Sequence, residues 1–248
     1  MKRYVLLITL FYLTLNPVTA QLSSVSNIQV GGSISVGTSF LLGQNNYGGC
    51  EMDYKLTEGF AGGVFGHLNW FDKLGLQVEV NFALLGQEWE DTHGNDAVAR
   101  DLNLGYIQVP ILFRYTDIYF STASAAPNLY VLSGVQLGFL QAVRQQYYRN
   151  GEAESFQEAQ LGNPFATKLP DFTEDDEQYR EFEISAVLGV GLEFPITRLM
   201  HLQGEFRYNI GISDVNEAAW RFPDIRNQYV GSKNHFLAFR FGVAFNLL

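Results

Sequence analysis

Alternation of apolar and polar residues constrains the fold of this chain more than any other feature. Residues 74–85 read LGLQVEVNFALL, in which Leu76, Val78 and Val80 alternate with polar side chains. Successive side chains of a strand point to opposite faces, so this segment predicts a strand with one apolar and one polar face. We extend this strand to about residue 89. The same period recurs in seven further segments, which brings the predicted strands to eight: residues 28–42, 59–70, 104–115, 129–143, 182–194, 199–213 and 234–248.

The connections between these strands differ in length. The segments after the second and sixth strands, residues 71–73 and 195–198, are short, whereas residues 116–128 form a turn of intermediate length. Long segments follow the other strands, at residues 43–58, 86–100, 144–181 and 214–233. Long loops on one rim and short turns on the other are typical of outer-membrane barrels. The spacing therefore predicts an antiparallel up-and-down order, with long extracellular loops, short periplasmic turns and both termini in the periplasm.

The polar face decides which side of the sheet points outward. A soluble ligand-binding barrel would also alternate, but its apolar side chains would face inward and its polar ones would face water. Here only 17% of residues are charged, and the polar faces hold mainly glycine, serine and glutamine, which is unusual for a surface in water. A sheet that faces lipid must close on itself, because an unpaired backbone group in a bilayer costs several kcal/mol. We predict an all-β, eight-stranded transmembrane barrel with its apolar rows in lipid.

The N-terminal residues predict export. Lys2 and Arg3 precede an apolar run over residues 4–15, and small residues at 18–20 follow, as in a cleavable signal peptide. An N-terminal membrane anchor is the alternative, but the run is short for a span. We predict a signal peptide over residues 1–20 and one barrel domain over residues 21–248. After residue 20 no stretch of about 18 apolar residues predicts a membrane helix.

Charge and cysteine content exclude some classes of protein. Residues 21–248 hold 14 basic and 26 acidic residues, a formal charge of −12, which argues against binding to nucleic acid. The single cysteine, Cys50, cannot form an intramolecular disulfide, and its distance from residue 20 argues against a lipid anchor at the cleavage point.

The predicted lumen is narrow. Eight strands enclose an interior that side chains fill, so we predict a plug of polar side chains, with a proton or ion path as the alternative. Charges inside must be paired or hydrated, since an isolated buried ion costs many kcal/mol. Adjacent strands predict ion pairs between Glu79 and Arg114 and between Glu205 and Arg240. The inward-facing charged residues are Glu79, Arg114, Glu183, Glu193, Glu205, Arg207 and Arg240.

No catalytic, cofactor or metal site is predicted. A lipid deacylase needs serine, histidine and an acid on the lipid-facing surface, whereas His67 and His201 lie on the polar face. A protease at the rim could use Asp91 with His93 or Asp96, although a solvated acidic turn explains these residues more simply. The acidic run at residues 171–177 could attract divalent cations, including those that bridge lipopolysaccharide, but it lacks the spacing of a calcium loop.

Aromatic residues near strand ends predict girdles at the membrane interfaces, where rings are favoured. They are Trp70, Phe71, Trp89, Tyr106 and Tyr115.

Four segments resemble a known family. They read GFAGGVF from residue 59, YIQVPILFRY at 106–115, LGVGLEFP at 188–195 and EFRYNIGISDV at 205–215. In this order they resemble the outer-membrane β-barrel (PorT-like) proteins of Bacteroidota. The resemblance implies a barrel in the outer membrane, and the family takes its name from a member that supports type IX secretion. Two features depart from it: residues 23–42 match no segment of that member, and the chain ends in Asn-Leu-Leu rather than in an aromatic residue.

The predicted function is that of a non-enzymatic integral outer-membrane barrel with a side-chain-filled lumen and no cofactor. Its expected partners are outer-membrane lipid, lipopolysaccharide and the assembly machinery. The alternatives are an accessory of type IX secretion with secretion-system partners, a surface adhesion or binding protein, and a lipid-A-modifying barrel enzyme.

Overall fold

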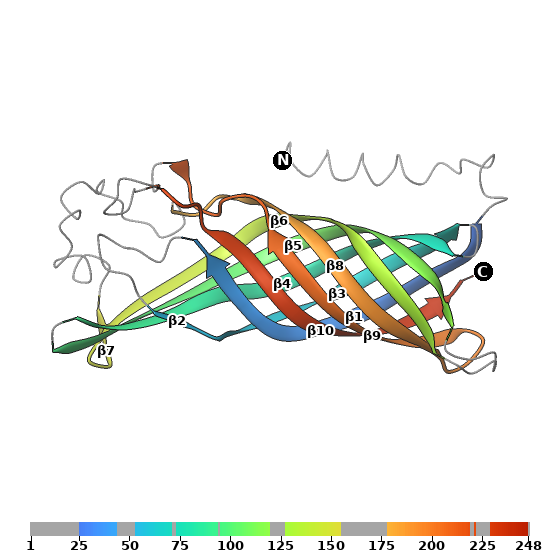
Figure 1. Cartoon of the computed structure of the whole chain (residues 1–248), viewed down its shortest axis with the longest axis horizontal. Helices are drawn as coiled ribbons and strands as arrows, with labels where there is room; N and C mark the ends of the chain where they lie inside the picture. The colour runs from blue at the N-terminus through green and yellow to red at the C-terminus, as the bar shows by residue number, and fades with distance from the viewer. Residues whose placement is uncertain are drawn as a thin grey trace.

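Eight long strands form a closed antiparallel ring in the computed structural model (Figure 1). Each strand pairs with its neighbours in the chain, and β1 pairs with both β3 and β10, which closes the ring. The predicted eight-stranded up-and-down barrel is confirmed. The structure describes residues 25–43, 53–70, 73–93, 95–119, 127–154, 178–218, 221 and 229–247. The ring consists of β1 (Val25–Leu42), β3 (Thr57–Trp70), β4 (Leu74–His93), β5 (Asp96–Tyr119), β6 (Asn128–Arg149), β8 (Phe182–Pro195), β9 (Met200–Gly211) and β10 (Lys233–Asn246).

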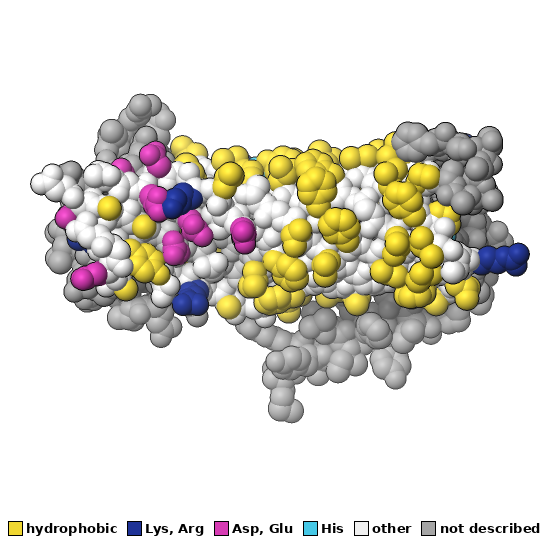
Figure 2. Space-filling view, turned by 90° about the horizontal axis from the view of Figure 1, so that it is seen from below, with side chains coloured by type: hydrophobic (Ala, Val, Ile, Leu, Met, Phe, Trp, Pro, Cys, Tyr) yellow, Lys and Arg dark blue, Asp and Glu magenta, His cyan; other side chains and the backbone are white. Residues whose placement is uncertain are grey.

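The apolar rows face outward. Val64 and Phe113 are 62% and 64% exposed, whereas Gln77 and Gln108, on the opposite face of β4 and β5, are buried. Figure 2 shows apolar side chains gathered over most of the barrel on the face in view. A closed ring leaves no strand edge unpaired, as a sheet surrounded by lipid requires. The described residues contain no helix that is long and apolar enough to cross a membrane.

Strands extend into two of the predicted loops. The segment expected as a loop at residues 86–100 continues β4 and β5 to a hairpin in which His93 pairs with Asp96. β6 likewise continues to Arg149 and turns into the short strand β7 (Glu152–Glu154). At that turn Asn150 and Gly151 have φ angles of 51° and 84°. Two successive positive φ angles are typical of the two-residue turn that Asn-Gly favours, so this dipeptide was an unused signal in the sequence.

These extensions form a small sheet beyond the barrel. A short strand within the predicted loop 43–58, β2 (Asp53–Lys55), pairs with residues 88–90 of β4. We call the end at which β1, β4, β6 and β9 finish the long-loop rim, and the opposite end the short-turn rim. The rim sheet comprises β2, β7 and residues 86–93, 96–103 and 144–149. The predicted signal peptide, Cys50, Phe71 and the acidic run 171–177 lie outside the described residues.

Candidate functional site: the filled lumen and the long-loop rim

The polar face of the strands lines the lumen, as predicted. All seven charged residues expected there are buried, with Glu79, Arg114 and Arg240 each only 1% exposed. His67 is also buried, and His201 is half-buried beside the Glu193 carboxylate, with 3.1 Å between Nδ1 and Oε1. Neither histidine therefore lies on the lipid-facing surface, where a lipid deacylase would need it.

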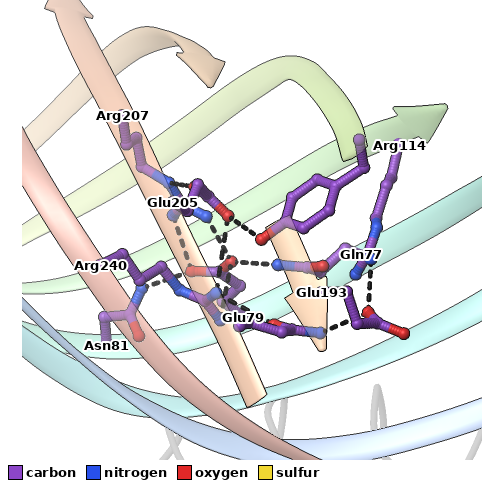
Figure 3. Close-up of polar contacts among 10 residues, drawn as sticks. Gln77, Glu79, Asn81, Arg114, Glu193, Glu205, Arg207 and Arg240 are labelled. Atoms are coloured by element: carbon purple, nitrogen blue, oxygen red, sulfur yellow. Dashed lines mark hydrogen bonds and ion pairs between the residues drawn. The ribbon is translucent and has the colours of Figure 1, made fainter. Parts of the chain in front are cut away.

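Two arginines and two glutamates form a closed group in the middle of the lumen (Figure 3). The Arg207 guanidinium donates to both oxygens of Glu79, at 2.9 Å from Nη1 and 2.8 Å from Nη2, and its Nε donates to Glu205. Arg240 lies 3.5 Å from Glu205 Oε2 and 3.7 Å from Glu79 Oε1. We call these four residues the central quartet. A bidentate arginine contact of this kind fixes both partners in position.

The predicted pair Glu205–Arg240 is confirmed, since the two residues face each other across β9 and β10. The predicted pair Glu79–Arg114 is wrong. The register between β4 and β5 sets Arg114 opposite Gly75, four residues from Glu79. Glu79 instead reaches across the lumen to Arg207, on a strand that β4 does not pair with. Strand neighbourhood predicted the partner wrongly because long side chains span a narrow barrel.

Arg114 belongs to a second group nearer the short-turn rim. Its guanidinium donates to Glu193 and lies 3.7 Å from the centre of the Tyr130 ring. Gln203 Nε2 donates to the same carboxylate at 3.1 Å, and Gln29 Nε2 lies 3.4 Å from its other oxygen. Tyr130 also donates to Glu205 at 3.1 Å and so connects this group to the central quartet.

The lumen is apolar toward the long-loop rim, where a polar plug was predicted. Leu85, Leu102 and Leu104 fall on the inward face and are buried with Trp89 and Phe236. We call this set, which also includes Leu41, Ala61, Ala83, Tyr106, Tyr179, Val215 and Ala238, the apolar layer. Buried apolar side chains therefore fill part of the lumen beside the polar groups.

Two of the predicted girdle residues belong to the apolar layer. Tyr106 is 1% exposed and accepts a hydrogen bond of 3.0 Å from Asn234. Trp89 is also buried, with the Arg100 guanidinium 4.7 Å from its ring centre. Their assignment to an interface girdle is wrong, because each sits on the inward parity of its strand. Trp70 and Tyr115, near the short-turn rim, remain on the outward face.

Residues 178–181 and 213–218 close onto the apolar layer. Tyr179 forms a bridge with Asn216, and its hydroxyl accepts a hydrogen bond of 2.8 Å from Arg100. Asp214 holds this segment together, because it pairs with Arg221 at 3.0 Å and accepts from Tyr229. Burial and the hydrogen bond to this carboxylate raise the pKa of the Tyr229 hydroxyl.

Of the rim candidates for catalysis, His93 and Asp96 are paired in the register of the β4–β5 hairpin. The Asp96 carboxylate accepts from Arg149 at 3.1 Å and from Asn150 at 2.9 Å. Its hydrogen bonds to Asn150 and Arg149 lower the pKa of this exposed carboxyl. Asp91 lies on the neighbouring strand, and the side chain of His93 is outside the described part of the structure. Among the described residues, no group of three or more His, Cys, Asp or Glu could hold a metal ion.

Several solved structures resemble this fold at low sequence identity. OprG from Pseudomonas aeruginosa is 9% identical, with a TM-score of 0.44, and the match covers 89% of this chain and 95% of that one. Neisserial surface protein A is 16% identical, with a TM-score of 0.40 and coverage of 89% and 97%. Ail, the attachment invasion locus protein of Yersinia pestis, is 13% identical, with a TM-score of 0.38 and coverage of 89% and 99%. Among curated proteins, none matches the sequence.

A closed ring with an apolar outer band and a filled lumen defines an outer-membrane β-barrel. Residues 19–217 match the family described as outer membrane protein beta-barrel domain, and the chain belongs to this family. Membership indicates the outer membrane as the location of the protein.

Proposed function

We propose that this protein is a closed, non-enzymatic outer-membrane barrel that meets its partners at its rims and not through its lumen. The filled lumen supports the proposal. The central quartet holds four charged side chains that are each 4% exposed or less, and the apolar layer covers it toward the long-loop rim. Moving an ion through the lumen would require breaking these ion pairs and passing the buried side chains of the apolar layer.

The proposed absence of catalysis is supported by the two lumen histidines. His67 is bonded to Gln29 and His201 to Asn246, and both face inward, away from a substrate in the lipid phase. His235 has the outward parity of β10 and is held between Phe40, on which it stacks, and Tyr208, to which it is bonded. The lumen groups are instead positioned to stabilise the barrel.

The proposed orientation puts the long-loop rim outside the cell and both termini in the periplasm, after removal of residues 1–20. Its support is that β1 begins and β10 ends at the short-turn rim, as in barrels with short periplasmic turns. The proposed partners are outer-membrane lipid and lipopolysaccharide along the apolar band, and the assembly machinery during insertion.

Conductance in planar bilayers tests the closed lumen. The wild-type barrel should insert without current steps above the leak of the bare bilayer, and a porin of about 16–18 strands inserted in parallel provides the positive control. Reproducible single-channel steps from the wild-type protein would refute the proposal. For orientation, Cys50→Ser with a new cysteine at Gly151 should be labelled by an impermeant maleimide on intact cells, and one at Thr197 should not.

A second candidate is a role as a PorT-like accessory of type IX secretion. It is supported by the four resembling segments and their order along the chain. Deletion of the gene, with the secretome, surface proteome and lipid A compared together, distinguishes the classes. Loss of secreted cargo would support the secretion role, altered lipid A would support an enzyme, and loss of surface binding would support an adhesion protein.

A further inference from the structure

A cleft lies on the outward face of the rim sheet, away from the lumen. The strand register sets Asp53, Glu90, Ala99 and Tyr148 in one row across β2, β4, β5 and β6. The adjacent row, which includes Trp89 and Arg100, is buried on the opposite face of the sheet. The row that contains Glu90 and Ala99 therefore points outward. Figure 2 shows acidic and basic side chains gathered beyond one end of the apolar band on the face in view.

Small side chains make the surface concave. Ala97 and Ala99 lie between the β4 side chains and Tyr148, and they leave a cleft of about 580 Å³. We call it the outer cleft. Its volume falls within the roughly 300–1,000 Å³ of small-molecule sites. None of its side chains takes part in the lumen groups described above.

The lining suits a ligand rich in hydroxyl groups. Asp53 and Glu90 offer carboxylate acceptors, and Lys55, which is paired with Glu90, retains further N–H donors. The Tyr148 ring supplies a flat apolar wall, and its hydroxyl is fixed by a hydrogen bond of 2.9 Å to Gln146. One face of a sugar ring is lined by C–H groups while its edge carries hydroxyls, so it matches such a wall flanked by acceptors.

The charge of the cleft narrows the class of sugar. Asp53, Glu90 and Lys55 point outward at the cleft, a formal charge of −1, and Asp91 adds a further carboxylate at its edge with the parity of the opposite face. Such a site repels phosphate and sulfate groups and attracts ammonium groups. We propose that the outer cleft binds a neutral or amino-bearing oligosaccharide and rejects sulfated or phosphorylated ones.

The test uses the full-length barrel in a zwitterionic detergent without a sugar headgroup. The probes are a glucosamine trimer, maltotriose and sulfated dextran, with binding followed by isothermal titration calorimetry and saturation-transfer NMR. Tyr148→Ala removes the wall, and Ala99→Leu fills the cleft without removing a polar group. Asn103→Ala, at an exposed position of the same strand outside the cleft, is the matched control.

We expect the glucosamine trimer to bind, maltotriose to bind more weakly and sulfated dextran not to bind. Tyr148→Ala and Ala99→Leu should each weaken binding by about tenfold or more, whereas Asn103→Ala should not. The heat-modifiable gel mobility of each variant verifies that it is folded. If one of the two cleft variants is not folded, the binding affinity of the other cleft variant decides the test. Absence of saturable binding, binding of sulfated dextran alone, or affinity unchanged in either folded cleft variant would overturn the inference.

Nanodiscs with and without rough lipopolysaccharide distinguish the source of the sugar. Unchanged trimer binding in the presence of lipopolysaccharide means a saccharide from solution, whereas occupation of the cleft by the anionic lipopolysaccharide core, seen as saturation transfer to its sugars, would overturn the proposed rejection of phosphorylated sugars. The inference rests on the proposed function only for the outward orientation of the rim. Sugar binding in detergent does not depend on the orientation of the barrel in the membrane or on its conductance. The proposed function and the proposed sugar site can therefore fail independently of each other.

Discussion

Removal of Arg207 from the central quartet should destabilise the barrel strongly. Its guanidinium contacts the carboxylates of Glu79 and Glu205. Without it Arg240, whose nitrogens lie 3.7 and 3.5 Å away, would be the remaining cation of the quartet, beside neutral donors such as Asn81 and Tyr130. Breaking a buried ion pair by removing one partner costs about 3–5 kcal/mol, because it leaves an uncompensated charge. We therefore expect Arg207→Met to lower the free energy of unfolding by about 3–5 kcal/mol.

Neutralising the stranded charge should restore part of this loss. We expect the double variant Glu79→Gln/Arg207→Met to be more stable than Arg207→Met alone, with a coupling energy of about 2 kcal/mol. Urea unfolding in phospholipid vesicles, followed by tryptophan fluorescence, provides the assay. The matched cycle with Arg114→Met should show coupling to Glu79→Gln below about 0.5 kcal/mol, because Arg114 pairs with Glu193 instead.

Two outcomes would refute this reasoning. A cost below about 1 kcal/mol for Arg207→Met would mean that water or rearranged neighbours compensate the carboxylates, and the quartet would not be a dry ion group. Stronger coupling of Glu79 to Arg114 than to Arg207 would mean that the register between β4 and β5 differs from the one described.

The remaining predictions concern the hairpin, the lumen and the lipid face. Gly151→Val should cost about 1–2 kcal/mol locally, because φ is 84° there, and should raise protease cleavage of the β6–β7 hairpin while leaving the unfolding midpoint of the barrel unchanged. Gly191→Ala should cost about 1–3 kcal/mol in urea titrations, because its Cβ would lie 2.4 Å from the Tyr130 ring. Val64→Arg, on the lipid face, should destabilise the barrel in vesicles by about 2–4 kcal/mol, whereas the exposed-hairpin control Glu152→Arg should have no measurable effect. Equal stability of the two arginine variants in vesicles would contradict a lipid-facing Val64.

The period of two predicted much of the structure because side-chain direction in a strand depends only on position parity. It identified all eight strands, the outward rows and the seven buried charges. Parity also carries less obvious information that was not used. Trp89, in the segment 86–100 that was also expected as a loop, keeps the inward parity of β4, and Leu102 keeps that of β5 before its expected start at residue 104. Apolar residues with inward parity in a segment expected to be a loop could have predicted both the extended hairpin and the apolar layer.

The ion pairs could be predicted only in part because parity does not determine register. Glu205 and Arg240 lie on consecutive ring strands and are directly opposed, so strand neighbourhood sufficed. Glu79 and Arg114 also lie on neighbouring strands, but they are four residues out of register, about 13 Å along the strand. A contact across the lumen, such as Glu79 to Arg207, depends on the closed shape of the ring, which no local pattern contains.

The two faces of the barrel therefore exclude different errors of strand pairing. A slip by one residue moves every apolar side chain from lipid to lumen, so the outward rows select strongly against odd shifts. A slip by two or four residues preserves that partition, and the apolar rows cannot detect it. The central quartet detects such a slip, because a shift of β4 by two residues would move Glu79 by roughly 7 Å relative to Arg207 and leave buried charges unpaired.

On this reasoning the quartet contributes a unique register rather than net stability. Replacing all four of its residues by apolar ones of similar size should then preserve barrel stability but broaden the register, measured as heterogeneous cross-strand contacts by NMR in micelles. A single set of β4–β5 and β9–β10 contacts in that variant would show that the turns fix the register without the quartet.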